Sequence, residues 1–293
     1  MTIYSKQRTI GKPVSCSGVG VHSGQKVNLT LKPAPINHGI KFSRVDLPNK
    51  PIIPALFRMV VDTSLATVIG KDGFIVSTIE HLMSCFSGFS IDNILVEVDA
   101  YEVPIMDGSG ALFSELIEKS GVVEQEGLKY FIAMTKPIEI EANEKFVGIY
   151  PYSTYKITCT IEYDHPLIKT QTYSIDMFDG SFEKEISKAR TFGFFHEVEY
   201  LKKYGFAKGG SLDNVIVIGK DCVLNEKGLR YKDEFVRHKI LDCIGDFSLL
   251  GMPLLGHVIA KKSGHAFNHK LIEEIFSKKD SWKTMSIEEY MKL

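Results

Sequence analysis

Residues 120–129 read Ser-Gly-Val-Val-Glu-Gln-Glu-Gly-Leu-Lys, and they divide the chain in two. The stretch is polar and rich in glutamate and glycine, and a new series of strand patterns begins after it at Tyr130. Because domain boundaries fall in such polar segments, we expect one domain over residues 1–125 and a second over residues 126–293. A chain of 293 residues is long enough for two domains, each with its own core.

The segment before this boundary contains both strand and helix patterns. Strand patterns, with apolar residues at alternate positions, occupy 26–32 and 91–99, and helix patterns occupy 77–88 and 109–119. A hydroxyl residue at the start of 77–88, Ser77 or Thr78, is a candidate N-cap. Gly88 and Gly121 are placed to end the two helices.

The segment after the boundary shows the same mixture. Residues 155–163 alternate between apolar and polar, which predicts a strand. The other patterns are a helix near 195–204, a glycine-rich turn at 208–211, an apolar run at 215–218, a long helix from 234 to about 250, and an amphipathic helix that includes 272–276. Because strands and helices come in runs and do not alternate regularly, the fold class is predicted as α+β, not a doubly wound parallel sheet.

Composition and charge exclude several classes of protein. The chain has 35 Lys plus Arg against 36 Asp plus Glu, so we expect no nucleic-acid partner bound through bulk positive charge. No long apolar run follows Lys6 and Arg8, so we expect no secretory signal, no transmembrane segment and a cytoplasmic location. The 5 scattered cysteines form no C-x-x-C pair, which argues against a disulfide framework or a thiolate zinc site and favours buried, reduced thiols.

The long predicted helix carries the clearest chemical pattern. His238, Asp242 and Asp246 are spaced four residues apart, so an imidazole and two carboxylates project from one stripe. Such a pair at i and i+4 can supply two ligands to a zinc-type ion, and the apolar residues around it predict that the stripe lines a cleft between helices. The alternative is an exposed face of ion-paired side chains.

A catalytic metal needs a further protein ligand, and the short predicted helix offers Glu80 and His81. Neighbouring residues on a helix diverge by about 100°, so only one of the two can face the ion directly. We assign His81 as the ligand and Glu80 as the base. The alternative is a surface glutamate beside a half-buried histidine.

His265 follows a predicted strand on a loop that contains Gly264. It is well placed to act as a general acid, with Asp246 orienting the ring and keeping it protonated. Two glycine-rich segments, 18–24 and 208–211, have neither the spacing of a dinucleotide fingerprint nor that of a P-loop. Backbone amides at 208–211 beside Lys208 are nevertheless able to contact a phosphate.

Taken together, these motifs resemble the UDP-3-O-acyl-N-acetylglucosamine deacetylase family, the zinc amidases of the committed step of lipid A synthesis. The motifs run in matching order from about residue 18 to about residue 270. They are 18–24 (GVGVHSG), 78–82 (TIEHL), 104–110 (PIMDGSG), 189–193 (ARTFG), 208–211 (KGGS), 228–231 (GLRY), 236–239 (VRHK) and 264–265 (GH).

The resemblance implies two similar domains, each a β-sheet layered on two helices, with the helix layers packed face to face and the active site at their junction. It implies that His81, His238 and Asp242 bind Zn²⁺, with Fe²⁺ a possible substitute. By the same resemblance Glu80 is the general base, and Thr191 and His265 stabilise the oxyanion and protonate the leaving amine. Asp246 lies next to His265, on the side away from the substrate. Whether one group or two carries both proton transfers stays open.

The resemblance also implies how an acylated UDP-sugar is held. The residues that it assigns to substrate binding are Lys239, Phe192, Gly210, Ser211, Ser263 and His22. An insert around 194–217 is expected to form an apolar passage for the 3-O-acyl chain, although most of its apolar residues, taken singly, are better explained as core. We expect a monomer. Two other classes stay open: a small-molecule kinase that uses 208–211, and a metal-stabilised binding protein without turnover.

Overall fold

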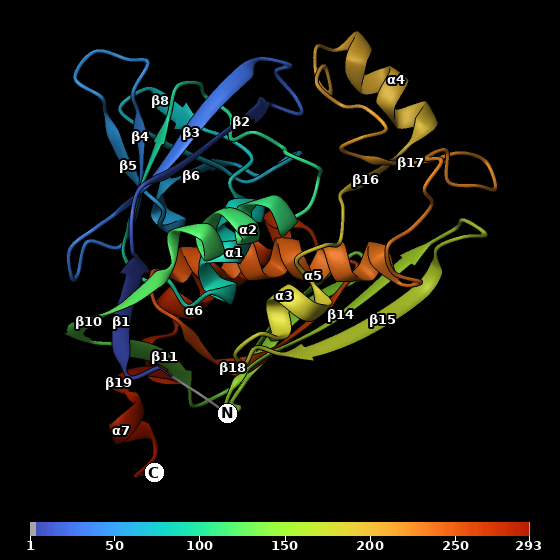
Figure 1. Ribbon diagram of the computed structural model, residues 1–293. Coiled ribbons are helices and arrows are strands. Elements are labelled where there is room, and N and C mark those ends of the chain that lie inside the picture. The colour runs from blue at the N-terminus through green and yellow to red at the C-terminus, as the bar shows by residue number, and fades with distance from the viewer. Residues whose placement is uncertain (1–3, 293) are drawn as a thin grey trace.

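The computed structural model describes residues 4–292; residues 1–3 and 293, the outer ends of the two predicted domains, lie outside it. The structure is α+β, as the sequence predicts. Two main sheets lie on opposite sides of a layer of helices, and Figure 1 shows this layer between the blue and teal strands and the green strands. No helix in residues 4–292 is long and apolar enough to cross a membrane.

The first main sheet has the strand order β2-β3-β9-β4-β5. Its strands are β2 (Val14–Val19), β3 (Lys26–Pro33), β4 (Ile40–Arg44), β5 (Ile52–Pro54) and β9 (Ile94–Val98), and its helices are α1 (Glu80–Gly88) and α2 (Ala111–Ser120). Val27, Leu29 and Leu31 alternate along β3 and are fully buried, so the predicted strand is confirmed.

A small side sheet accompanies the first main sheet. It is formed by β6 (Val60–Asp62), β7 (Val68–Lys71) and β8 (Phe74–Val76), with the 3₁₀ turn η1 (Phe57–Met59) before it. The backbone N–H of Ile79, just before α1, donates to the carbonyl of Thr67 at 3.4 Å. The side sheet is therefore attached to the start of α1.

The second main sheet has the order β12-β13-β18-β11-β19, and β14 pairs with both β18 and β15. Its strands are β11 (Tyr130–Met134), β12 (Ile138–Ala142), β13 (Lys145–Tyr150), β14 (Tyr155–Tyr163), β15 (Lys169–Asp176), β18 (Leu254–Lys261) and β19 (Trp282–Ser286). Helices α5 (Glu234–Phe247) and α6 (His265–Ser277) cover it. The remaining helical turns are α3 (Ser181–Glu185), η2 (Ser248–Leu250), η3 (Lys279–Ser281) and α7 (Ile287–Tyr290).

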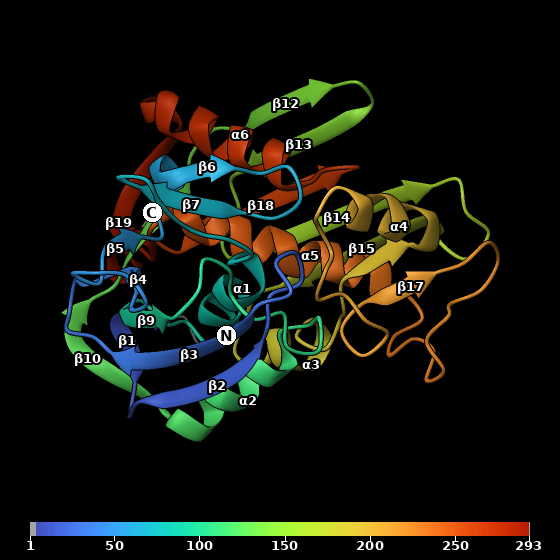
Figure 2. The ribbon, with the colours of Figure 1, turned by 90° about the horizontal axis from the view of Figure 1, so that it is seen from above.

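The predicted insert forms a separate projection. It consists of β16 (Phe192–Phe194), α4 (Phe195–Lys203) and β17 (Ile216–Ile218), with β16 and β17 parallel. In Figures 1 and 2 α4 stands apart from the helix layer, beyond one end of α5. The helix predicted near 195–204 is thus confirmed.

The segment at the predicted domain boundary is itself a strand. β10 (Val122–Leu128) pairs antiparallel with β1 (Lys6–Ile10), so the chain crosses between the two halves as half of a two-stranded ribbon. The polar composition of β10 does not predict a strand. A two-stranded ribbon at the surface buries little apolar area, so its strands need few apolar residues.

Three local predictions were wrong. Ile79 occupies the N-cap of α1 with no side-chain cap, because the Thr78 hydroxyl donates instead to Glu102 at 3.2 Å. His265 is the first residue of α6, not a loop residue. All 5 cysteines are free, but Cys222 is exposed and Cys16 is only partly buried.

Candidate functional site

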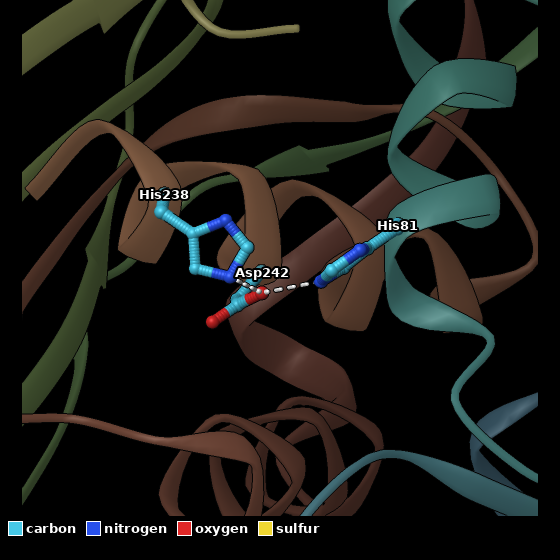
Figure 3. A group of neighbouring side chains, drawn as sticks. All are labelled: His81, His238 and Asp242. Carbon is cyan, nitrogen blue, oxygen red and sulfur yellow. Dashed lines mark ion pairs between the residues drawn. The ribbon is translucent and has the colours of Figure 1, made fainter. Parts of the chain in front are cut away.

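Two helices from the two halves of the chain bring together the three predicted metal ligands (Figure 3). His238 and Asp242 lie one turn apart on α5, and His81 reaches them from α1. Their ligand atoms all lie within 4.8 Å of one another, and each residue is buried. The Oδ1 of Asp242 is 3.3 Å from the Nε2 of His238 and 3.7 Å from the Nε2 of His81.

The protonation states of this group suit a cation. The Nδ1 of His238 lies 3.1 Å from the carbonyl oxygen of Ala189 and must donate to it, so its neutral ring turns the Nε2 lone pair toward Asp242. Burial lowers the pKa of His238, and it lowers the pKa of His81 to about 3. Two neutral imidazoles then face a carboxylate, and the buried Nδ1 of His81 has no hydrogen-bond partner within residues 4–292, an arrangement that a bound cation makes favourable.

Asp242 stays ionised in this setting. Burial by itself would raise the pKa of Asp242, but the positive charge of nearby groups, among them Lys239 and protonated His265, outweighs it and holds the pKa below its ordinary value. The ammonium of Lys239 lies 2.9 Å from Asp242 Oδ2, on the oxygen that the histidines leave free. The donor set of two imidazole nitrogens and one carboxylate oxygen fits a divalent ion of the zinc type.

Glu80 lies beside this group at the first position of α1. Its Oε2 accepts a hydrogen bond from the backbone N–H of Thr67 at 3.1 Å, and its Oε1 is 3.8 Å from the Nε2 of His265. Burial raises the pKa of Glu80 to about 7, against the opposing attraction of His265. A carboxylate with a pKa near neutrality is suited to accept and release a proton.

His265 and Asp246 form a second pair on the other side of Glu80. The Nδ1 of His265 donates to Asp246 Oδ2 at 2.9 Å. Burial opposes the charged imidazolium, but the Asp246 carboxylate outweighs it and raises the pKa of His265 to about 10. The ring is therefore protonated at neutral pH, and its Nε2–H is directed toward the side of Glu80.

Two buried residues that the sequence did not single out also hold Asp246. The hydroxyl of Thr67 donates to Asp246 Oδ1 at 2.6 Å, and the amide of Asn268 donates to Asp246 Oδ2 at 2.8 Å. Ser263, a predicted substrate residue, donates to the side-chain oxygen of Asn268 at 2.6 Å. The position of Asn268 one turn after His265 was the one signal available in the sequence.

The predicted substrate residues Lys239 and Phe192 lie at the edge of the metal group. The Lys239 ammonium is 5.6 Å from the centre of the Phe192 ring, which lies 6.3 Å from the ring of His238. Thr191 precedes Phe192 and is half-buried; its backbone N–H donates to the carbonyl of Gly108 at 2.7 Å. Its hydroxyl forms no hydrogen bond within residues 4–292 and is free to contact a substrate.

The ion pair between Arg190 and Glu234 fixes this part of the chain. Arg190 Nε lies 2.8 Å from Glu234 Oε1, and both side chains are buried. Because Glu234 begins α5, the pair fastens the segment that carries Ala189 and Thr191 to the helix that carries His238. The ARTFG motif indicated this segment, but not the partner of its arginine.

The other predicted substrate residues lie where the first half of the chain meets the insert. The carbonyl of His22 accepts from the backbone N–H of Lys208 at 3.3 Å, and the His22 ring packs edge-on against Phe206. Gly210 and Ser211 follow directly in the insert. In the part of the chain that the structure describes, none of these three forms a hydrogen bond or ion pair with the metal-ligating side chains.

A cavity of about 350 Å³ lies away from this chemistry, around the C-terminal ends of α1 and α5. Its lining includes Phe86, Ser87, Phe247 and Leu254, and none of the residues that line it belongs to the metal group or the acid–base pairs. We therefore locate the functional site from the convergence of titratable side chains, not from the size of this cavity.

Comparison with known proteins gives consistent matches over nearly the whole chain. The family model described as LpxC: UDP-3-O-acyl N-acetylglycosamine deacetylase matches residues 7–277. A UDP-3-O-acyl-N-acetylglucosamine deacetylase of Myxococcus xanthus (strain DK1622) is 52% identical over 271 residues, which cover 92% of this chain and 86% of the relative. One of Saccharophagus degradans is 49% identical over 286 residues, which cover 97% and 94%.

Proposed function

The chain belongs to the UDP-3-O-acyl N-acetylglycosamine deacetylase (LpxC) family, and from that premise we propose that it removes the acetyl group of UDP-3-O-acyl-N-acetylglucosamine. The products are acetate and the free amine of the sugar, at the committed step of lipid A synthesis. The observation that carries this proposal is the convergence of His81, His238 and Asp242 beside Glu80 and His265.

His81, His238 and Asp242 would hold the metal ion, and we propose Zn²⁺, with Fe²⁺ as a substitute that the same donors accept. When bound there, such an ion supplies a Lewis acid that polarises a carbonyl oxygen and lowers the pKa of water. The chain's own contribution is to keep both imidazoles neutral and Asp242 ionised, so that all three donors are ready to bind.

Glu80 and His265 would share the proton transfers of amide hydrolysis. Glu80 takes a proton from water, and the water oxygen forms a bond to the acetyl carbon. His265 gives its Nε2 proton to the amide nitrogen as the carbon–nitrogen bond breaks. The two groups are suited to these roles because one pKa is near 7 and the other near 10, so at neutral pH a base and an acid stand side by side.

Thr191 and Lys239 would bind the polar parts of the reacting complex. The free hydroxyl of Thr191 is a donor for the negative charge that develops on the acetyl oxygen. The ammonium of Lys239 lies between Asp242 and the Phe192 ring, and it supplies positive charge for an anionic group of the substrate. Ser263 acts through Asn268, and we place it at the rim of the same site.

The insert would receive the acyl chain. Phe195, Phe206 and Leu212 are exposed there, and aromatic surface is added by Tyr200 on α4 and by Tyr204 directly after it. Exposed apolar surface of this kind on a projecting segment is typical of a binding region. Ile216, which lies within the segment that the resemblance assigns to the passage, is fully buried and belongs to the core. His22, Gly210 and Ser211 would line the junction between the passage and the site.

The two halves of the chain supply different groups to the proposed site. We propose residues 1–125 and 126–293 as domains, because the first supplies Glu80 and His81 and the second supplies His238, Asp242 and His265. Neither half has a complete ligand set by itself. A monomeric state and a cytoplasmic location remain predictions from the sequence.

Acetate release from UDP-3-O-acyl-N-acetylglucosamine tests the function directly. We expect the zinc-loaded protein to release one acetate per amine formed, and the variant Glu80→Gln to keep the metal while losing about 10²–10⁴-fold in rate. Metal content and acetate are measured on the same samples. A zinc-free protein with full activity would contradict the proposal.

The same experiment distinguishes the deacetylase from the two other classes of protein, a small-molecule kinase and a metal-stabilised binding protein. A kinase that uses 208–211 would consume ATP with Mg²⁺ and would not need His81 or His238. A metal-stabilised binding protein would retain zinc, bind the sugar and release no acetate from it, with or without Glu80.

A further inference from the structure

Thr67 uses all of its polar groups on the acid–base site. Its hydroxyl donates to Asp246 Oδ1 at 2.6 Å and its backbone N–H donates to Glu80 Oε2 at 3.1 Å. Its carbonyl accepts from the backbone N–H of Ile79, the residue before α1, at 3.4 Å. Thr67 is only 2% exposed, so water does not compete for these bonds.

The direction of these bonds follows from the charge of their partners. A backbone N–H can only donate, and the Thr67 hydroxyl donates to a carboxylate oxygen of Asp246, which accepts. Hydrogen bonds to a buried charged group are short and strong, and Thr is stiff at χ1 because its side chain is branched at Cβ. Thr67 is therefore a rigid donor to two carboxylates at once.

The origin of Thr67 makes this contact informative. Glu80, Asp246 and His265 come from α1, α5 and α6, and Thr67 comes from the segment between β6 and β7. Asp246 Oδ2 is bonded by Asn268 and His265, and the His265 Nδ1 also lies 3.1 Å from Oδ1. Thr67 thus joins the Glu80 carboxylate to the Asp246–His265 pair through a fourth element of the fold.

We propose that Thr67 is a positioning residue for the reaction: it holds Glu80 and Asp246, and through Asp246 the His265 ring, at the separation that proton transfer needs. This inference rests on the proposed function for its kinetic consequence. Thr67 bonds to the proton-transfer groups Glu80 and Asp246 and, within residues 4–292, forms no hydrogen bond with His81, His238 or Asp242, so its effect should appear in kcat and not in the affinity for the sugar.

The variant Thr67→Val removes the hydroxyl and keeps the shape, while Thr67→Ser keeps the hydroxyl. We expect Thr67→Val to lower kcat about tenfold or more with KM within about twofold of the native value, and Thr67→Ser to recover most of the loss. Thr63→Val is the matched control, because Thr63 lies in the same segment and its hydroxyl forms no hydrogen bond within residues 4–292.

A double-mutant cycle distinguishes positioning from general damage. If Thr67 acts through Asp246, then adding Thr67→Val to the Asp246→Asn variant should lower kcat little further than Asp246→Asn does alone. An equal loss in both backgrounds, or native kcat in Thr67→Val, would overturn the inference. A fall in kcat of the same size in Thr63→Val would overturn it as well.

A spectroscopic measurement keeps the inference testable if the proposed function fails. In that case no variant releases acetate, and the imidazole proton resonances of His265 decide whether Thr67 positions this ring. We expect the Nδ1–H resonance and the titration midpoint of His265 to move in Thr67→Val and to stay unchanged in Thr63→Val. An unmoved His265 resonance in Thr67→Val would refute the positioning role.

Discussion

Gly245 of α5 lies directly against the backbone of Glu80 at the start of α1. A Cβ built on Gly245 would come within 2.1 Å of the Glu80 carbonyl oxygen and 2.7 Å of its carbonyl carbon. The two helices therefore touch backbone to backbone at this point, between Asp242 and Asp246 in the sequence. Because only glycine lacks a Cβ, the close approach that brings His81 to Asp242 depends on this residue.

Gly245→Ala should separate the two helices and weaken the metal site. The added methyl group meets rigid backbone, so α1 must shift and carry Glu80 and His81 away from α5. Since a displacement of about 1 Å can cost about a hundredfold in rate, we expect a loss of that order together with reduced metal retention. Metal per protein after dialysis and the rate of acetate release check this. Native values for both would show that the contact is not needed.

His238→Ala should abolish metal retention. The change removes one of the three proposed ligands and also leaves the Ala189 carbonyl without its donor. We expect metal content to fall to background after dialysis and activity to fall with it. His257→Ala is the matched control, because this half-buried histidine on β18 bonds to Thr158 and lies outside the ligand group. A His238→Ala protein that keeps the metal would remove His238 from the site.

The dependence of activity on pH should be bell-shaped, and Asp246→Asn should move its basic limb. Activity requires protonated His265, and its raised pKa means that this form is lost only as pH rises through about 10. Asp246→Asn removes the carboxylate that overcomes burial, so the pKa of His265 falls and activity is lost at lower pH. The acidic limb reports Glu80 and should move less. A basic limb that stays in place, measured as kcat/KM against pH, would exclude His265 as the acid.

Glu234→Gln should destabilise the fold at the start of α5. Breaking a buried ion pair leaves the Arg190 charge uncompensated, which costs about 3–5 kcal/mol in the free energy of unfolding. Urea unfolding of the metal-free protein measures this. Asp280→Asn serves as the control, because its ion pair with Lys136 is exposed and should contribute nothing measurable. Equal effects of the two changes would show that burial of the pair does not matter.

The stripe of His238, Asp242 and Asp246 was predictable because it depends on local geometry alone. Residues four apart share one face of a helix whatever packs against it. The same reasoning predicted the strand in residues 26–32 and the helix near 195–204, since the period of apolar residues is a local property. That Glu80 and His81 are neighbours on one helix was likewise visible, and the assignment of His81 to the metal and Glu80 to the proton stays a prediction.

Other features depend on contacts between distant segments. Thr67 and Asn268 carry no pattern that marks them, and they matter only because folding places both against Asp246. Thr78 was a plausible cap, but it bonds to Glu102, and His265 begins a helix where a loop was predicted. Local propensity is a weak constraint, and a buried partner from elsewhere in the chain outweighs it.

By itself, then, the sequence determined which elements form over 26–32, 195–204 and 234–247 and that His238, Asp242 and Asp246 share one helix face, because helical and strand periodicity is set within a few residues. Only the tertiary structure decided that the ligands from α1 and α5 meet, at the one position where Gly245 lets the two backbones touch. It also decided that Asp246 is held by three donors from other parts of the fold. These relationships join residues up to 179 positions apart, and no local pattern encodes a separation of that kind.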